Sequence, residues 1–258
     1  MLSPMSVDGG RYLCPRFENQ RVVVTGGARG IGASIVRAFA SEGAETVIVD
    51  LLIDEARSLA EELGGSAIGC DLSDPADTAK GMDDAISALG GIDVLVNNAG
   101  VFKITPLLDI SAEEWDWVFS INTRAMLLTT QVAARAMIAQ GTGGKIVNTA
   151  SMGGKVGAAN QAHYAASKAA VISLTQVSAA ELGVHDINVN AICPGYVLTE
   201  MGAATRTPEM VAEWSAMSPL GRLADPSDVA SMALFLASDD ADYCTGQAMN
   251  VTGGMISH

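Results

Sequence analysis

Short apolar runs alternate with longer stretches of helical periodicity along most of the chain. The runs are rich in Val and Ile and occupy residues 22–25, 46–50, 67–71, 92–97, 145–151 and 187–193. Strands that alternate with helices in this way form βαβ units, whose strands are parallel. Most of the runs are apolar throughout, as expected for strands covered by helices on both faces. The pattern predicts an α/β fold with a parallel sheet between two layers of helices.

Prolines mark several expected helix starts. Pro75, Pro208 and Pro226 each stand where a helix can begin. Asp74 and Asp225 precede two of them and are suited to serve as N-caps. Longer helical stretches are expected at residues 31–41, 113–140 and 164–182.

Length and composition are those of a globular domain. The 258 residues are 49% hydrophobic and 17% charged, and α/β folds of this length form single domains. Residues 1–19 show no period, so they are interpreted as an arm outside a core domain at 20–258. No run reaches ~18 apolar residues, and the arm lacks the apolar core of a signal peptide. A cytoplasmic protein without a membrane span is therefore expected.

Charge and cysteine spacing exclude further classes. Lys and Arg number 15 against 29 Asp and Glu, a formal net charge of -14, which disfavours nucleic acid and other anionic partners. No CxxC pair or neighbouring histidine cluster accompanies the four cysteines, Cys14, Cys70, Cys193 and Cys244. Neither a metal site nor a disulfide framework is expected, and the thiols are expected to be reduced.

The run TGGARGIG at residues 25–32 places four glycines between a predicted strand and a predicted helix. Glycine lets another group approach the backbone closely, and backbone N–H groups at a helix start bind anions. The next predicted strand ends in Asp50, at the position where an acidic side chain holds a ribose 2′-hydroxyl. The run alone is also explained as a tight turn, but together with Asp50 it predicts a dinucleotide site.

Asp50 also favours NAD over NADP. A carboxylate accepts hydrogen bonds from the ribose diol but repels a 2′-phosphate. Arg29 is the opposing observation, because its guanidinium within the glycine run could bind that phosphate; otherwise it is a solvated loop residue. Leu51 and Leu52 follow Asp50, so no second basic residue is present there. NAD is the expected cofactor, with NADP as the alternative.

Tyr164 and Lys168 are candidates for proton transfer. They are four residues apart, so on a helix they share one face. An ammonium near a phenol favours the phenolate and lowers a pKa that starts near ~10, which lets tyrosine exchange a proton nearer neutral pH. Ser151, a hydroxyl at the end of a predicted strand, can donate to a substrate oxygen. Taken singly, Tyr164 is also explained as a core residue and Lys168 as a solvated one.

Further motifs make the chain similar to a known family. NNAG stands at residues 97–100, YAASK at 164–168 and PG at 194–195, and Asn122 lies between the first two. Their order and spacing resemble the short-chain dehydrogenase/reductase family over residues 20–255. The resemblance implies a single-domain Rossmann fold with a doubly wound parallel sheet of about seven strands. It also implies a homotetramer that moves hydride between a nicotinamide and an alcohol or carbonyl.

The resemblance assigns catalytic roles to four residues. Tyr164 matches the acid/base, and Ser151 matches the group that stabilises the substrate oxygen. Lys168 matches the lysine that also holds the nicotinamide ribose. Asn122 matches an asparagine that kinks its helix and holds a water bridging to that lysine. Without the family, Asn122 is equally explained as a surface residue.

Cofactor contacts beyond Tyr164 and Lys168 are also implied by the resemblance. Asp71 and Leu72 match positions beside the adenine, and Asn98 has bracing of the central strands as its alternative role. The implied cofactor-binding residues are Gly26, Arg29, Gly30, Ile31, Asp50, Asp71, Leu72, Asn98, Gly100, Pro194, Gly195, Val197 and Thr199.

A variable segment at residues 196–223 is expected to close over the substrate as a lid, as it does in the family. His163 stands next to Tyr164, but Ser151, Tyr164 and Lys168 with Asn122 already supply a proton path, so it is interpreted as a pocket-wall or surface residue. The expected substrate-pocket residues are Met152, Gly153, His163, Tyr196, Met201 and Trp214.

The sequence as a whole predicts an NAD-dependent dehydrogenase for a small secondary alcohol or polyol. The first alternative is an NADPH-dependent reductase of 3-oxoacyl thioesters on an acyl carrier protein. The acidic net charge of -14 argues against it, because such an enzyme must attract an acidic partner. The second alternative is a non-catalytic dinucleotide-binding scaffold, which would not need Ser151, Tyr164 and Lys168.

Overall fold

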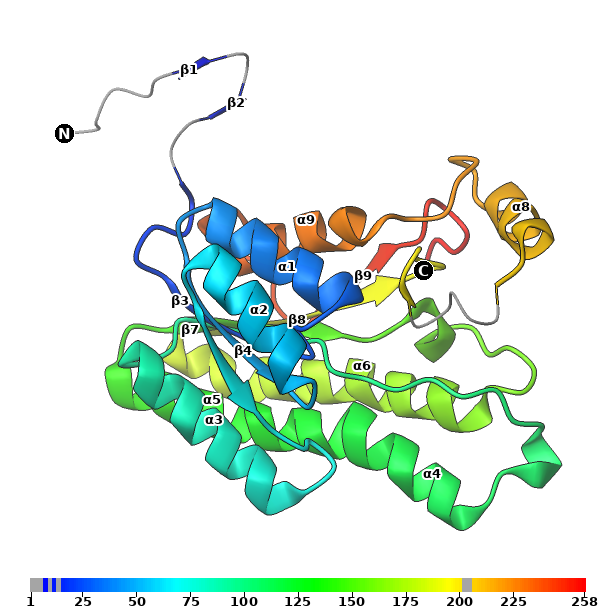
Figure 1. Cartoon of the computed structure of the whole chain (residues 1–258), viewed down its shortest axis with the longest axis horizontal. Coiled ribbons are helices and arrows are strands. Elements are labelled where there is room, and N and C mark those ends of the chain that lie inside the picture. Colours follow the sequence, from blue (N-terminus) through cyan, green and yellow to red (C-terminus); the bar gives the residue numbers. More distant parts are fainter. Residues whose placement is uncertain (1–6, 9–10, 13–14, 201–205) are drawn as a thin grey trace.

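Seven parallel strands form the central sheet in the computed structural model of the chain, which describes residues 7–8, 11–12, 15–200 and 206–258 (Figure 1). The order across the sheet is β5-β4-β3-β6-β7-β8-β9, which confirms the predicted doubly wound sheet. The strands are β3 (Arg21–Thr25), β4 (Glu45–Asp50), β5 (Ser66–Gly69), β6 (Val94–Asn97), β7 (Gly144–Thr149), β8 (Ile187–Pro194) and β9 (Ala248–Val251). Two short strands, β1 (Val7–Asp8) and β2 (Arg11–Tyr12), pair antiparallel outside this sheet.

Predicted and observed strands differ mainly at their ends. The runs at 67–71 and 145–151 were predicted to continue too far, because β5 ends at Gly69 and β7 at Thr149. β6 begins at Val94 and not at residue 92. No predicted run covers β9, because its four residues are only half-buried and give no continuous apolar pattern.

Helices cover both faces of the sheet, as predicted. Side chains alternate along a strand, so Val22 and Val24 of β3 pack on one face and Val23 on the other. Figure 1 shows one layer above the sheet and the other below it. The first layer holds α1 (Gly30–Ser41), α2 (Ile53–Leu63) and α9 (Pro226–Ala237), and the second α3 (Pro75–Leu89), α5 (Ala125–Gln140) and α6 (Ala162–Leu182).

The expected helix starts are confirmed at all three prolines. Asp74 Oδ1 accepts the Ala76 N–H at 2.7 Å and so caps α3. Asp225 forms a capping box with Asp228 at the start of α9. α8 (Pro208–Met217) begins after Thr207, whose hydroxyl caps it. Of the helices in the described ranges, none is both long and apolar enough to cross a membrane.

The helix expected at 113–140 is interrupted. α4 (Ala112–Phe119) and α5 are joined by a π-helical turn, η2 (Ser120–Arg124), which contains Asn122. A π-helical turn inserts an extra residue and changes the direction in which the next side chains point. The interruption therefore directs Asn122 into the protein, where it is fully buried.

Phe17 corrects the boundary predicted for the N-terminal arm. Its side chain is 1% exposed, and its ring lies edge-on to Phe39 at a centroid distance of 4.8 Å. Arg16 forms an ion pair with Glu42 beside it. The core thus includes part of residues 1–19, and a single buried aromatic residue leaves no periodic pattern by which to predict this.

Candidate active site

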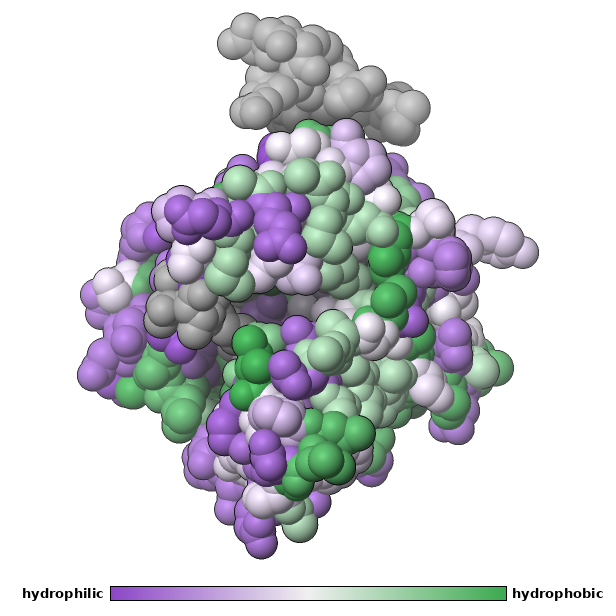
Figure 2. All heavy atoms as spheres, turned by 90° about the vertical axis from the view of Figure 1, so that its right-hand side faces the viewer, coloured by the Kyte–Doolittle hydropathy of each residue, from purple (hydrophilic) through white to green (hydrophobic). Residues whose placement is uncertain are grey.

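The candidate residues lie at the carboxyl ends of the parallel strands. The strand order reverses between β3 and β6, and sites in doubly wound sheets form beyond the carboxyl ends at such a point. Figure 2 shows this side of the molecule, which faces right in Figure 1, and its surface is hollowed near the middle.

Close backbone approaches explain the glycine run. Gly26 has φ +64°, and a Cβ there would lie 2.6 Å from Ala99 Cα. A Cβ on Gly32 would lie 2.0 Å from the Gly26 carbonyl oxygen. α1 begins at Gly30, and its N-cap, Arg29, makes no capping hydrogen bond with its side chain. The first N–H groups of α1 are therefore available to an anion.

Asp50 is held beside this run. Its Oδ2 accepts the Ala28 N–H at 2.9 Å, and its Oδ1 accepts the Leu52 N–H at 2.9 Å. The carboxylate is half-buried, whereas Arg29 is exposed and Leu51 is 68% exposed. The backbone of the glycine run at residues 25–32 and the first N–H groups of α1 are called the glycine cradle from here on. The structure holds the Asp50 side chain, and not that of Arg29, in fixed contact with this cradle.

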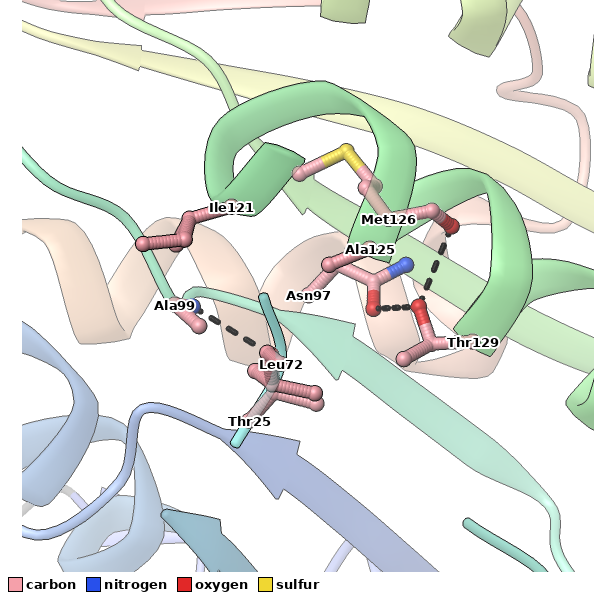
Figure 3. Close-up of a pocket in the computed structure, with 8 residues that line it drawn as sticks. All are labelled: Thr25, Leu72, Asn97, Ala99, Ile121, Ala125, Met126 and Thr129. Carbon is pink, nitrogen blue, oxygen red and sulfur yellow. Dashed lines mark hydrogen bonds between the residues drawn. The ribbon is translucent and has the colours of Figure 1, made fainter. Parts of the chain in front are cut away.

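The residues implied at the adenine differ in exposure. Asp71 is exposed and its Oδ1 accepts the Ser73 N–H at 2.9 Å. Leu72 is 8% exposed and lines a cavity of about 10 Å³ between β6 and α5, together with Thr25, Ala99 and other residues (Figure 3). Such a cavity has room for about one water molecule. Leu72 is therefore directed into the protein and not toward open solvent.

Asn98 braces the cradle, as the alternative interpretation of the sequence stated. Its Nδ2 donates to the Gly26 carbonyl at 2.8 Å, and its backbone N–H donates to Thr25 Oγ1 at 3.1 Å. Ile31, the second residue of α1, is half-buried and packs on the apolar cluster of that face. These contacts fix the positions of the cradle and the end of β6 relative to each other.

The segment after β8 also reaches the cradle. Pro194 ends β8 and is buried, and the Gly195 N–H donates to the Val251 carbonyl at 2.9 Å. Val197 forms an isolated bridge with Ala224. A Cβ on Gly30 would lie 3.6 Å from Thr199 Cβ, so this segment passes directly over the start of α1.

The four candidate catalytic residues meet at one place. Lys168 Nζ donates to the Thr149 carbonyl at 2.7 Å and lies 5.9 Å from the Tyr164 ring centroid. A Cβ on Gly153 would lie 3.4 Å from Ser151 Oγ and 3.5 Å from the Tyr164 ring. Gly100 leaves room in front of the lysine, because a Cβ there would lie 3.3 Å from both Lys168 Nζ and Asn122 Oδ1.

Burial dominates the ionisation of Tyr164 and Lys168. It raises the pKa of Tyr164, and hydrogen bonding with Ser151 acts in the opposite direction. It also lowers the pKa of Lys168 to about 8. The expectation of a phenol pKa below its ordinary value is therefore corrected. Desolvation penalises the charged form of both groups and is the largest influence on the pKa of each.

Asn122 ties the segment after β6 to α6. Its Oδ1 accepts the Val101 N–H at 2.8 Å, and its Nδ2 donates to the Val101 carbonyl and to Ser167 Oγ, both at 3.0 Å. Its side chain is 0% exposed, which excludes the surface interpretation. Ser167 Oγ in turn donates to the Tyr164 carbonyl at 2.7 Å.

The expected substrate residues fall into three groups. Met152 and Gly153 lie in the 3-10 turn η3 (Met152–Gly154), where the Gly153 N–H donates to Ser151 Oγ at 3.0 Å. Tyr196 and Trp214 stack with a centroid distance of 4.4 Å and an interplanar angle of 6°. Met201 lies outside the described residues.

The position of His163 differs from the one expected from the sequence. It was interpreted as a pocket-wall or surface residue, but its side chain is 0% exposed. Its Nε2 lies 2.9 Å from Glu114 Oε1. It therefore belongs to a buried polar cluster behind Tyr164, because a charged partner on α4 draws the imidazole inward.

Sequence reasoning missed four residues beside the candidate site. The Phe102 ring lies edge-on to Tyr164 at 4.8 Å and 84°, and no sequence signal indicates it. Thr149 acts through its carbonyl, which sequence does not reveal. Ser167 stands inside the YAASK motif, where its spacing of three from Tyr164 is a usable signal. Glu114 was not singled out, because Ser111 and Glu114 match a capping box, and this pattern already explains Glu114 as a residue that stabilises the helix start.

Comparisons with known proteins agree with this geometry. The family model described as enoyl-(acyl carrier protein) reductase matches residues 26–256. The chain is 40% identical to the sorbitol dehydrogenase of Cereibacter sphaeroides over 93% of this chain and 98% of that protein. It is 39% identical to the galactitol 2-dehydrogenase of Agrobacterium fabrum, again over 93% and 98%.

A solved structure gives the same result. The crystal structure of a short-chain type dehydrogenase/reductase from Mycobacterium marinum is similar with a TM-score of 0.89 and 36% identity, covering 95% of this chain and 98% of that one. The relatives are oxidoreductases that act on CH–OH groups of small molecules. The chain belongs to the short-chain dehydrogenase/reductase family, whose members use nicotinamide cofactors.

Proposed function

We propose that this protein is an NAD-dependent dehydrogenase that oxidises a small secondary alcohol or polyol, with Tyr164 as the general base. The observation that carries the proposal is the joint position of Ser151, Tyr164 and Lys168 beside the glycine cradle. A non-catalytic scaffold needs the cradle but has no use for a buried lysine facing a half-buried tyrosine.

Several features of the chain fit a nicotinamide dinucleotide. The first N–H groups of α1 suit its phosphates, and the fixed carboxylate of Asp50 suits a ribose diol. Lys168 has a single acceptor among the described residues, the Thr149 carbonyl, which leaves two of its three N–H donors for ribose hydroxyls. Thr149 Oγ1 nearby is a buried polar atom without a partner in the described part of the chain. When bound, the cofactor supplies the hydride acceptor.

The residues of the chain supply the proton transfer. Ser151 Oγ donates a hydrogen bond to the substrate oxygen and so fixes its position next to the phenol. Tyr164 accepts the hydroxyl proton as the C–H bond breaks, and it returns that proton in the reverse direction. The Lys168 ammonium, close to the ring, stabilises the phenolate that accepts the proton.

The choice of NAD over NADP rests on Asp50. Both oxygens of its carboxylate already accept backbone N–H groups, so it cannot turn away from an added phosphate. Leu51 beside it is exposed and offers no positive charge. Arg29 is also exposed, with no contact that fixes it over the cradle among the described residues.

A polyol-type substrate is supported by the relatives, which are named for sorbitol and galactitol. Met152, Gly153, Tyr196 and Trp214 are the proposed pocket residues. The proposed location is the cytoplasm, because a reducing compartment suits the free thiols of Cys70, Cys193 and Cys244. The proposed assembly is a homotetramer.

The second candidate is a reductase of thioesters on an acyl carrier protein, favoured by the description of the matching family model. Such a reaction requires a basic surface at the mouth of the site. Arg206 donates to the carbonyls of Val197 and Thr199, and Arg222 pairs with Asp228, so these two arginines are already engaged. With a net charge of -14, the chain offers little attraction to an acidic carrier.

Tyr164→Phe tests the mechanism. The variant keeps the ring and its contact with Phe102 but lacks the hydroxyl that exchanges the proton. We expect kcat to fall by ~10² or more while the Kd for NADH stays within about twofold. Turnover of sorbitol or galactitol and NADH fluorescence titration measure the two quantities. Near wild-type turnover would remove Tyr164 from the mechanism.

A further inference from the structure

α6 carries Tyr164 and Lys168 but begins without an ordinary cap. Its N-cap is Gln161, whose side chain makes no capping hydrogen bond. The first backbone N–H groups of a helix have no partner within the helix, and Tyr164 stands in this first turn. The backbone N–H of the proposed general base therefore needs an acceptor from elsewhere.

His163 supplies that acceptor. Its Nδ1 lies 3.0 Å from the Tyr164 nitrogen, and a backbone N–H can only donate, so Nδ1 accepts. A neutral imidazole with Nδ1 as acceptor carries its proton on Nε2. Nε2 lies 2.9 Å from Glu114 Oε1, which can only accept when ionised. The two contacts together select one tautomer and one orientation of the ring.

Glu114 is itself held as an anion at the meeting point of three elements. Lys103 and Thr105, from the segment after β6, both donate to its carboxylate. These contacts hold the pKa of Glu114 at about 2. The same segment carries Phe102, whose ring packs edge-on against the Tyr164 ring. Glu114 thus connects α4, the Phe102 segment and the start of α6.

We propose that Glu114 and His163 form a positioning pair for Tyr164, which fixes its backbone through the imidazole and its ring through the Phe102 segment. His163 does not touch the substrate, because it is fully buried behind the tyrosine, and Glu114 acts on Tyr164 through His163 and the Phe102 segment. The inference rests on the proposed role of Tyr164 as general base. A displacement of ~1 Å at such a group is enough to lower turnover by up to ~10².

Kinetics of two His163 variants test the pair. His163→Ala removes both hydrogen bonds, and we expect kcat for the best polyol to fall about tenfold to a hundredfold. The Kd for NADH should stay within about twofold, because Lys168 and the cradle are unchanged. His163→Asn places Oδ1 where Nδ1 stood, so it should recover kcat to within about threefold of wild type. A purely structural role would give no such recovery.

Matched controls separate positioning from loss of charge or fold. Glu114→Ala should also lower kcat. Glu113→Ala, which changes an exposed residue on the same helix turn, should leave kcat unchanged. His185→Ala is the control for histidine removal, since His185 is exposed. The inference is overturned if His163→Ala keeps kcat within twofold. It is equally overturned if His163→Asn turns over no faster than His163→Ala.

A spectroscopic readout does not depend on turnover. In protein labelled with 15N-histidine at pH 8, the His163 signals should be those of the Nε2–H tautomer, and they should disappear in His163→Asn. An Nδ1–H tautomer would overturn the inference. If Tyr164→Phe stays active, or the wild type oxidises no alcohol, the proposed function fails instead, and this is distinguishable because the tautomer is read separately.

Discussion

Lys168 combines two requirements that conflict in a folded protein. Its charge must lie beside Tyr164 to favour the phenolate, yet its side chain is only 3% exposed. Burial lowers its pKa to about 8, from an ordinary value of 10.5. At neutral pH the folded protein therefore carries a buried cation with one carbonyl partner in the described part of the chain, which costs stability.

This conflict predicts a pH-dependent gain in stability on Lys168→Met. Between pH 8 and 10.5 the unfolded chain binds more protons at this lysine than the folded chain, so wild-type stability rises with pH there. The variant loses this dependence. At pH 7 we expect its free energy of unfolding to exceed that of wild type by about 1–3 kcal/mol, and the difference to vanish near pH 10.5.

Urea unfolding at the two pH values measures this difference. Lys80→Met, at an exposed position on α3, is the matched control and should change stability little. A Lys168→Met protein that is less stable than wild type at pH 7 would show that the contact with Thr149 outweighs the cost of burial. Catalysis should be lost in the variant in either case.

Strands and helices were predictable to different degrees. Buried parallel strands such as β3 and β8 give continuous apolar runs, so their positions followed from the sequence within a few residues. Capping aspartates and prolines marked the helix starts. β9 was not predicted, because its residues are half-buried and give no continuous apolar run. The burial of Phe17 was not predicted either, because one apolar residue makes no periodic pattern.

The candidate site was predictable only where motifs carry it. Ser151, Tyr164 and Lys168 were found by type and spacing, and the structure brings them together. The π-helical turn η2 left no signal in the apolar pattern, because an extra residue within a helix changes the period too little over five residues, and only the family resemblance implied a kink at Asn122. The partnership of Glu114 and His163 joins residues 49 positions apart, which no local pattern can reveal.

The π-helical turn predicts a large effect for Asn122→Leu. The variant leaves the half-buried N–H and carbonyl of Val101 without their partner, and the buried Ser167 hydroxyl keeps only its bond to the Tyr164 carbonyl. Each buried group without a partner costs about 1–3 kcal/mol, so we expect a loss of about 2–5 kcal/mol in the free energy of unfolding. Gln131→Leu, at an exposed position on α5, is the control for the added apolar volume. Equal stability of the two variants in urea would contradict the assigned role.

The surface of the whole molecule predicts its assembly. Outer positions of α5 and α6 carry exposed apolar side chains, among them Leu127, Ile138 and Val177. Exposed large apolar side chains on packed helices are typical of subunit contacts. We expect a homotetramer, about four times 26.5 kDa, by light scattering at micromolar concentration.

Two substitutions test this surface. Val177→Glu should weaken the tetramer, whereas Val184→Glu, beyond the end of α6, should not. Scattering from monomers alone would contradict the prediction.

Charge acts at the same scale and separates the two candidate reactions. The net charge of -14 allows a small neutral substrate and opposes an acidic carrier protein. Because oxidation of an alcohol releases a proton, we expect it to be favoured at alkaline pH. The reverse reduction of the carbonyl is expected nearer neutral pH.

The most direct measurement is a set of kcat/KM values for one enzyme preparation. The set comprises sorbitol, galactitol and simple secondary alcohols with NAD and with NADP, and a β-ketoacyl thioester with NADH and with NADPH. We expect a polyol or secondary alcohol with NAD to give the highest value, and Asp50→Ala to reduce the preference for NAD over NADP. A β-ketoacyl thioester reduced with NADPH well above every alcohol in the set would contradict the account.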